Sequence, residues 1–139
     1  MLQLINQSQI RMPRKWLEQC YRWMALELKL KKDLTLVFLN PIPARKLNSQ
    51  YRKKNYATDV LSFSSDIPSE LGELIMCPQV LQKQAQEHGH SFRAELAYML
   101  IHGVLHLQGY DHEKSKAEAK KMFQIQDQLF DRLCSKFHI

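Results

Sequence analysis

The chain has 139 residues, 45% of them hydrophobic and 24% charged, and these values fit one globular domain spanning 1–139 with a substantial core. Its apolar runs are shorter than the roughly 18 residues of a membrane span, and its first residues lack the layout of a signal peptide. We therefore expect a cytoplasmic protein with no membrane segment. The net charge of +6 favours a polyanionic partner.

The first thirty residues predict a strand followed by a helix. Residues 2–6 alternate weakly between apolar and polar side chains, as a short edge strand does. Pro13 suits the first turn of a helix, because its missing N–H has no intrahelical partner there. The apolar residues that follow recur at helical spacing and are expected in the core: Trp16, Leu17, Cys20, Trp23 and Met24.

The middle of the chain predicts three further strands and two helices. Residues 33–40 form a buried strand that stops at the turn of Asn40 and Pro41. A short helix follows, with Ala44, Leu47 and Tyr51 directed inward and its cations outward. Strands are expected over 58–64 and 71–77. Pro78 then begins a helix that runs to about Glu87.

The last third of the chain predicts two long helices. Residues 92–108 are apolar on most of the helical circumference, which indicates a buried helix. Ser115 and Glu118 form a capping box for a last helix. Its apolar stripe should fold back on the core and comprises Met122, Phe123, Leu129, Phe130, Leu133 and Phe137. The fold class is therefore α+β, with a small mixed sheet packed with helices.

A cluster of positive charge lies in residues 45–54. Five cations fall within these ten residues, namely Arg45, Lys46, Arg52, Lys53 and Lys54, and Tyr51 and Tyr56 lie among them. Such a run is often only a solvated helix face. Together with a metal site it would also suit contact with the phosphates of a nucleic acid.

The most specific signal is a group of three histidines, His102, His106 and His112. His102 and His106 are four residues apart, so a helix presents them on one face. Gly109 can end that helix in a left-handed conformation, and the following turn can return His112 to the same point. Three imidazoles with a free fourth position are typical of a catalytic zinc site, whereas structural zinc is normally closed by four ligands rich in cysteine. His88-Gly89-His90, in contrast, is expected to be a surface turn.

The neighbours of these histidines restrict the chemistry. Zinc proteases carry a general-base glutamate directly after the first histidine of H-E-x-x-H, and Gly103 occupies that place here. The small Gly103 suits a close approach by a strand or by a substrate backbone. Zinc bound by three neutral imidazoles keeps its +2 charge and suits an anionic substrate such as a phosphodiester. Beside the metal, the guanidinium of an arginine is the side chain best suited to bind the phosphate, because its planar fork binds two phosphate oxygens.

Three ordered motifs resemble the bacterial YbeY family over nearly the whole chain. They are Tyr51-Arg52-Lys53-Lys54-Asn55-Tyr56-Ala57-Thr58-Asp59-Val60-Leu61-Ser62-Phe63, then Leu71-Gly72-Glu73-Leu74, then His102 to His112. The chain departs from the family pattern at Glu73, where aspartate is usual, and at Ser64, where proline commonly follows Ser-Phe. Neither change falls on a proposed ligand, and Glu73 places a longer acidic side chain where the family usually has aspartate.

The resemblance implies a single α+β domain with a zincin-like metal site. It implies a metal-dependent endoribonuclease, specific for single strands, that acts in ribosomal RNA processing, especially at the 3′ end of the small-subunit RNA, and in ribosome quality control. It implies one zinc ion bound by His102, His106 and His112, with Arg52 as the functional arginine. RNA, the ribosome and ribosome-assembly proteins are the implied partners. In this hypothesis Arg52 and the metal, held in part by His102, bind one phosphate, and the nucleophile is water or the ribose 2′-OH.

Two other functions compete with this interpretation. One is a non-catalytic RNA-binding or ribosome-binding module in which zinc braces the fold, and the other is a zinc hydrolase of peptides or small molecules. Asp111 is either a partner that orients a ligand imidazole or a plain turn residue. Thr58 and Asp59 are expected to start a strand and tie down the loop that carries Arg52. The oligomeric state is left open.

Overall fold

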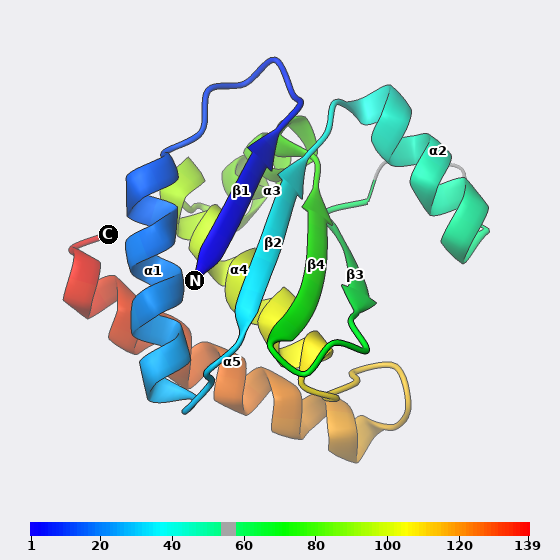
Figure 1. Ribbon diagram of the computed structural model, residues 1–139. Coiled ribbons are helices and arrows are strands. Elements are labelled where there is room, and N and C mark those ends of the chain that lie inside the picture. The colour runs from blue at the N-terminus through cyan, green and yellow to red at the C-terminus, as the bar shows by residue number, and fades with distance from the viewer. Residues whose placement is uncertain (54–57) are drawn as a thin grey trace.

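Four strands form one mixed sheet in the order β1-β2-β4-β3 (Figure 1). β1 pairs in parallel with β2, β2 in parallel with β4, and β3 antiparallel with β4. The computed structural model describes residues 1–53 and 58–139. The strands are β1 (Leu2–Asn6), β2 (Asp33–Phe38), β3 (Val60–Ser64) and β4 (Glu70–Met76). The predicted α+β class with a small mixed sheet is confirmed.

Five helices accompany the sheet within the described residues: α1 (Arg14–Glu27), α2 (Pro41–Arg52), α3 (Pro78–His88), α4 (Phe92–Leu107) and α5 (Lys116–Phe137). α4 crosses one face of the sheet, where it contacts β3 and β4, and α1 and α5 pack against it. α2 projects near the β4–β3 side of the sheet in the view of Figure 1. Each predicted strand and helix is present, and α4 occupies the centre of the molecule.

Strand boundaries differ from the prediction by one or two residues. β2 ends at Phe38 rather than at Asn40, and β3 begins at Val60 rather than at position 58. Before β3, the Asp59 side chain accepts a hydrogen bond of 2.8 Å from the backbone N–H of Val60. This local bond competes with strand pairing at the position where the ladder would otherwise begin.

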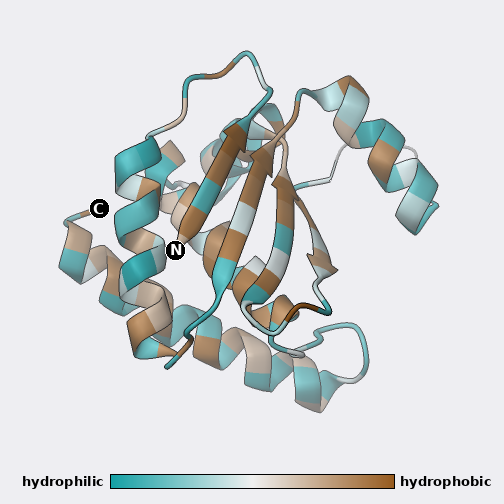
Figure 2. Ribbon diagram, in the orientation of Figure 1, coloured by the Kyte–Doolittle hydropathy of each residue, from teal (hydrophilic) through white to brown (hydrophobic). Residues whose placement is uncertain are grey.

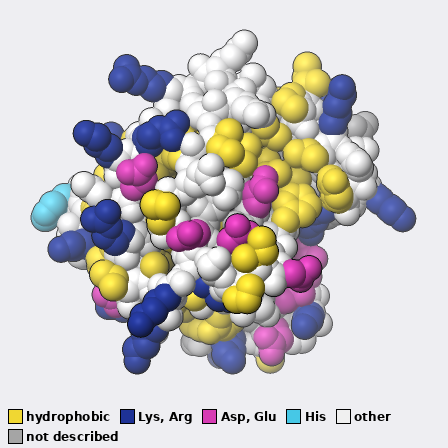
Figure 3. All heavy atoms as spheres, in the orientation of Figure 1, with side chains coloured by type: hydrophobic (Ala, Val, Ile, Leu, Met, Phe, Trp, Pro, Cys, Tyr) yellow, Lys and Arg dark blue, Asp and Glu magenta, His cyan; other side chains and the backbone are white. Residues whose placement is uncertain are grey.

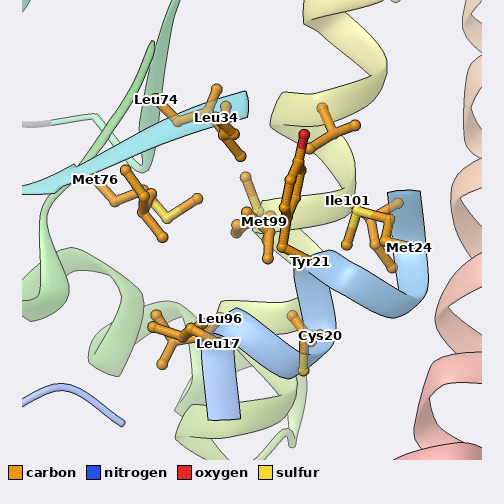
Figure 4. Packing of buried hydrophobic residues seen from close by; sticks show 14 of the residues in the cluster. Leu17, Cys20, Tyr21, Met24, Leu34, Leu74, Met76, Leu96, Met99 and Ile101 are labelled. Atoms are coloured by element: carbon orange, nitrogen blue, oxygen red, sulfur yellow. The ribbon is translucent and has the colours of Figure 1, made fainter. Parts of the chain in front are cut away.

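Alternation along the strands divides the apolar residues between the two faces of the sheet (Figure 2). Leu34, Leu36 and Phe38 are fully buried in the main core beneath the helices, whereas Val37 and Ile75 belong to a smaller cluster on the other face. Figure 4 shows the main core, in which Tyr21 and Met24 of α1 lie near Ile101 of α4. This packing holds α4 rigidly against the sheet.

The predicted cap of the last helix is present, whereas Pro13, predicted in the first turn of a helix, occupies the N-cap position just before α1. The Ser115 hydroxyl accepts from the backbone N–H of Glu118 at 3.1 Å, and Ser91 caps α4 in the same way through Ala94. α4 is buried on most of its circumference, as predicted. Two inward assignments were wrong: Tyr51 is 59% exposed, and Phe123 is 38% exposed. Tyr51 instead packs its ring edge-on against Phe63, and Asn48 takes the buried position of α2.

Gly72 allows β3 and β4 to approach each other, and we predict that Gly72→Ala destabilises the fold. An added Cβ would lie 2.3 Å from the carbonyl oxygen of Phe63, and the backbone φ of +148° disfavours any side chain. Backbone strain and overpacking together should lower the free energy of unfolding by about 3 kcal/mol and Tm by roughly 10 °C. Gly89→Ala is the control, since it also has a positive φ but nothing within 4 Å, and it should cost only about 1 kcal/mol. Equal Tm values for the two variants would contradict the prediction.

The sheet face opposite α4 is only partly covered. A shallow groove of about 480 Å³ is lined there mainly by apolar side chains, among them Val37, Phe63 and Ile75. In the view of Figure 3, hydrophobic side chains gather over this part of the surface, and Lys and Arg lie mostly toward the periphery. Among the residues that the structure describes, no helix is long and apolar enough to cross a membrane.

Candidate metal centre

Three imidazoles converge at the C-terminal end of α4. His102 and His106 lie one helical turn apart, with ring centroids 4.9 Å from each other, and the His112 ring lies 5.1 Å and 5.0 Å from them. One ring nitrogen from each residue lies within 4.8 Å of the other two. Zinc–nitrogen bonds of about 2.0–2.1 Å place tetrahedral ligand atoms roughly 3.3 Å apart, so a small adjustment of the rings would admit one ion.

The turn after α4 brings His112 back to the other two rings. Gly109 has a φ of +103°, and its N–H and that of Tyr110 donate to the carbonyls of His106 and Leu105. The Asp111 carboxylate accepts from the backbone N–H of Glu113 at 2.8 Å. This bond secures the turn. The charge of Asp111 also acts on the nearby His106 imidazole, where it opposes the larger effect of burial on the pKa.

Gln126 of α5 orients the first histidine. Its Oε1 accepts a hydrogen bond of 2.9 Å from Nδ1 of His102. The proton therefore lies on Nδ1, and the lone pair of Nε2 of His102 is free to bind a metal. Gln126 is fully buried, and its Nε2 has no hydrogen-bond partner among the described residues. Sequence reasoning missed this residue. A signal existed, because the polar Gln126 stands between Met122 and Leu129 at the spacing of the buried stripe of α5.

Burial favours the neutral ring at two of the three histidines, His102 and His106. Burial lowers the pKa of His102 below its usual range, although the hydrogen bond with Gln126 opposes this effect. Burial also lowers the pKa of His106, with smaller contributions from the neighbouring His102 and His112 rings. A neutral imidazole is the form that binds a metal, so the lowered pKa values of His102 and His106 favour metal binding at these two rings. The donor set and its spacing fit a divalent transition metal.

A cleft of about 410 Å³ opens over the histidines and is bordered by Arg52. Arg52 is the last residue of α2, and its Nη2 donates to Oε1 of Glu113 at 3.2 Å across the cleft. Both side chains are largely exposed, so the ion pair is weak and a phosphate can displace it. The cleft thus brings together the four predicted site residues, Arg52 and the three histidines.

Other residues singled out in the sequence have different places. Asp59 lines the cleft, but its carboxylate accepts from Val60, Thr58 and Gln84, which secures the start of β3. Glu73 lines the groove on the opposite face of the sheet. Gly103 packs against Leu74 of β4, so it serves the close approach of a strand. Lys54 of the basic run and the nearby Tyr56 lie outside the described residues.

Fold and site together define a small α+β protein with a three-histidine site, able to hold a metal, in an open cleft. The family model described as endoribonuclease YbeY matches residues 3–134. The chain belongs to the endoribonuclease YbeY family.

Individual relatives agree with this assignment. An endoribonuclease YbeY of Bdellovibrio bacteriovorus is 51% identical, and the match covers 96% of this chain and 95% of the relative. The endoribonuclease YbeY of Staphylococcus carnosus is 36% identical over 84% of this chain and 86% of its own. Among solved structures, the solution structure of TM1509 from Thermotoga maritima matches with a TM-score of 0.72 and 27% identity, covering 99% of this chain and 92% of that one. The resemblance read from the three sequence motifs is confirmed.

Proposed function

We propose that the whole chain, residues 1–139, is one domain that cuts single-stranded RNA with a single zinc ion held by His102, His106 and His112. Membership of the family makes the chain a metal-dependent endoribonuclease that acts in ribosomal RNA processing. The observation that carries the zinc proposal is the convergence of the three imidazole nitrogens within 4.8 Å at the floor of a cleft. Such a set leaves a fourth position open to solvent or substrate.

Different groups around the cleft have different roles in binding a phosphate. Zinc, when bound, would polarise a phosphoryl oxygen and supply positive charge. Arg52 exchanges its carboxylate partner, Glu113, for two oxygens of the scissile phosphate, because its fork fits both anions. Gln126 keeps the His102 ring in one tautomer. The nucleophile is either water or the ribose 2′-OH next to the scissile phosphate.

The substrate and setting follow from charge and family. The net charge of +6 attracts RNA without regard to its sequence, and the exposed Arg45 and Lys46 contribute to this attraction. We infer that the RNA is the 3′ region of the small-subunit ribosomal RNA, and that the protein also acts in ribosome quality control. It would then work in the cytoplasm, beside the ribosome and ribosome-assembly proteins.

Metal removal tests the proposal directly. Purified protein treated with a chelator should lose cleavage of a single-stranded RNA oligonucleotide, and added zinc should restore it. A duplex of the same sequence should be cut at least about tenfold more slowly, since the two backbones compete for one cleft. RNA binding measured by fluorescence anisotropy should partly survive chelation, because the surface cations remain. Equal loss of binding and cleavage would instead favour a binding module braced by zinc, and cleavage without metal would refute the proposal.

Gln126→Leu should weaken zinc binding at the three histidines by about 10–100-fold, the usual effect of removing a partner that orients a metal ligand. The leucine keeps the apolar packing of α5 but leaves Nδ1 of His102 without its acceptor. Competition with a chromophoric zinc chelator gives the affinity. Gln124→Leu, on the exposed side of the same helix, is the matched control and should bind zinc like the parent. Unchanged affinity in Gln126→Leu would show that this hydrogen bond does not orient the ligand.

A further inference from the structure

A second group of possible metal ligands lies where α3 passes into α4. His88 ends α3, His90 follows Gly89, and Glu95 lies in the first turn of α4. One ligand atom from each residue lies within 4.8 Å of the other two. The sequence predicted only a surface turn at His88-Gly89-His90, because nothing in the local pattern indicated that Glu95 would point back at it.

The Glu95 carboxylate is the anchor of this group. Its side chain is 0% exposed, whereas the rings of His88 and His90 are 49% and 29% exposed. Nδ1 of His88 lies 3.0 Å from Oε1 of Glu95, and Nδ1 of His90 lies 2.9 Å from Oε2. Burial of a carboxylate requires compensation by charge or by several hydrogen bonds. In the described part of the chain, no lysine or arginine forms an ion pair with Glu95, and the two imidazoles are the polar groups that lie within hydrogen-bond distance of its carboxylate.

The backbone around the group is rigid, so the ligands are held in place before any ion binds. The His90 N–H donates to the carbonyl of Ala85 at 2.8 Å, which fixes the turn at Gly89. The His90 ring packs against Phe130 at 5.4 Å and Tyr98 at 6.1 Å. Ligands positioned by packing in this way lose little freedom on binding a metal.

We propose that His88, His90 and Glu95 form a second site for a divalent transition metal such as zinc. Two imidazoles and one carboxylate are a known zinc ligand set. Oε2 of Glu95 lies 3.1 Å from Nδ1 of His88 and 2.9 Å from Nδ1 of His90, so these two pairs are within a few tenths of an ångström of the roughly 3.3 Å between tetrahedral zinc ligands. The cation compensates the buried carboxylate and ties α3 to α4. A fourth position stays open on the side of His88, which lines the same cleft as His102.

The second ion acts separately from the ion at the three histidines. Glu95 and His102 are seven residues apart on α4, which is about 10 Å along the helix axis. Two ions that share one displacement reaction lie roughly 3.5–4 Å apart, so this pair does not form a two-metal centre. The second site therefore stabilises the α3–α4 junction at the far end of the cleft and does not take part in bond cleavage.

Zinc stoichiometry tests this inference apart from activity. Isothermal titration of the metal-free protein with zinc should show two equivalents. His88→Asn should remove or weaken one of them by at least about tenfold and leave the other intact, because His88 is a half-exposed direct ligand. His106→Asn should remove the other equivalent. His138→Asn, an exposed histidine outside both groups, is the matched control and should still bind two.

A second measurement needs no variant. In imidazole-detected NMR of the parent protein, the ring signals of His88 and His90 should shift with one of the two zinc equivalents, and those of His102, His106 and His112 with the other. If the parent binds a single equivalent, or if the signals of His88 and His90 stay fixed through the titration, the second site is refuted. Loss of the equivalent at the three histidines would count against the proposed nuclease centre instead, so the two failures are distinguishable.

Discussion

His106→Ala should bind no zinc at the three-histidine centre and should lower RNA cleavage by more than about 10⁴-fold. Residues that act as a unit lose nearly their whole effect when one member is removed. His106 provides one of the three nitrogens, and its Nε2 lies 3.0 Å from Nδ1 of His112, so its removal leaves two of the three candidate ligand atoms. Zinc content by mass spectrometry and single-turnover cleavage of a labelled RNA give the two readouts.

Folding of the His106 variant should be preserved, because the His106 ring is only partly buried. Circular dichroism should therefore show the parent helix content in the absence of metal. RNA affinity at low salt should fall by less than tenfold, since the cationic surface is unchanged. A His106→Ala protein that still cuts RNA at a rate within tenfold of the parent would remove the basis for the catalytic metal.

Arg52→Ala should lower the rate of RNA cleavage by about 10²–10³-fold while zinc binding stays intact. Removing one preorganised donor to a developing charge has an effect of this size. Arg52 borders the cleft over the histidines, and it is not among the three candidate ligands. Arg52→Lys should recover only part of the rate, because an ammonium carries the charge without the planar fork. Single-turnover rates at saturating RNA separate this effect from weaker binding.

Glu113→Gln is the control for Arg52, since it breaks the same ion pair from the other side. If Arg52 acts on the phosphate, Glu113→Gln should keep the parent rate and bind RNA up to about fivefold more tightly, because a negative charge at the cleft is lost and the pair is weak. If Arg52 only braces the loop after α4 through Glu113, both variants should lose cleavage equally. Equal losses would therefore overturn the role of Arg52 in the reaction.

The sequence determined the metal centre to a large extent because its parts are local. His102 and His106 are one turn apart on any helix, and Gly109 ends that helix, so only the return of His112 needed the fold. The apolar circumference of α4 likewise predicted its central position, because such a helix has no polar face to expose to water. Short apolar runs, the first of them weakly alternating, predicted the strands of the sheet. Their boundaries are shifted where a side chain such as Asp59 accepts a hydrogen bond from a backbone N–H.

The tertiary structure alone decided which distant residues join the site. Gln126 reaches His102 because α5 packs along α4, and Arg52 meets Glu113 because α2 ends at the cleft. Phe123 follows an apolar stripe but lies beside the His102 and His112 rings rather than in the core. In the sequence, Glu95 is an ordinary acidic residue in the first turn of a helix. In the structure, it is buried and contacts two histidines. Helical periodicity fixes the face on which a side chain lies, but what meets that face depends on packing between segments far apart in the chain.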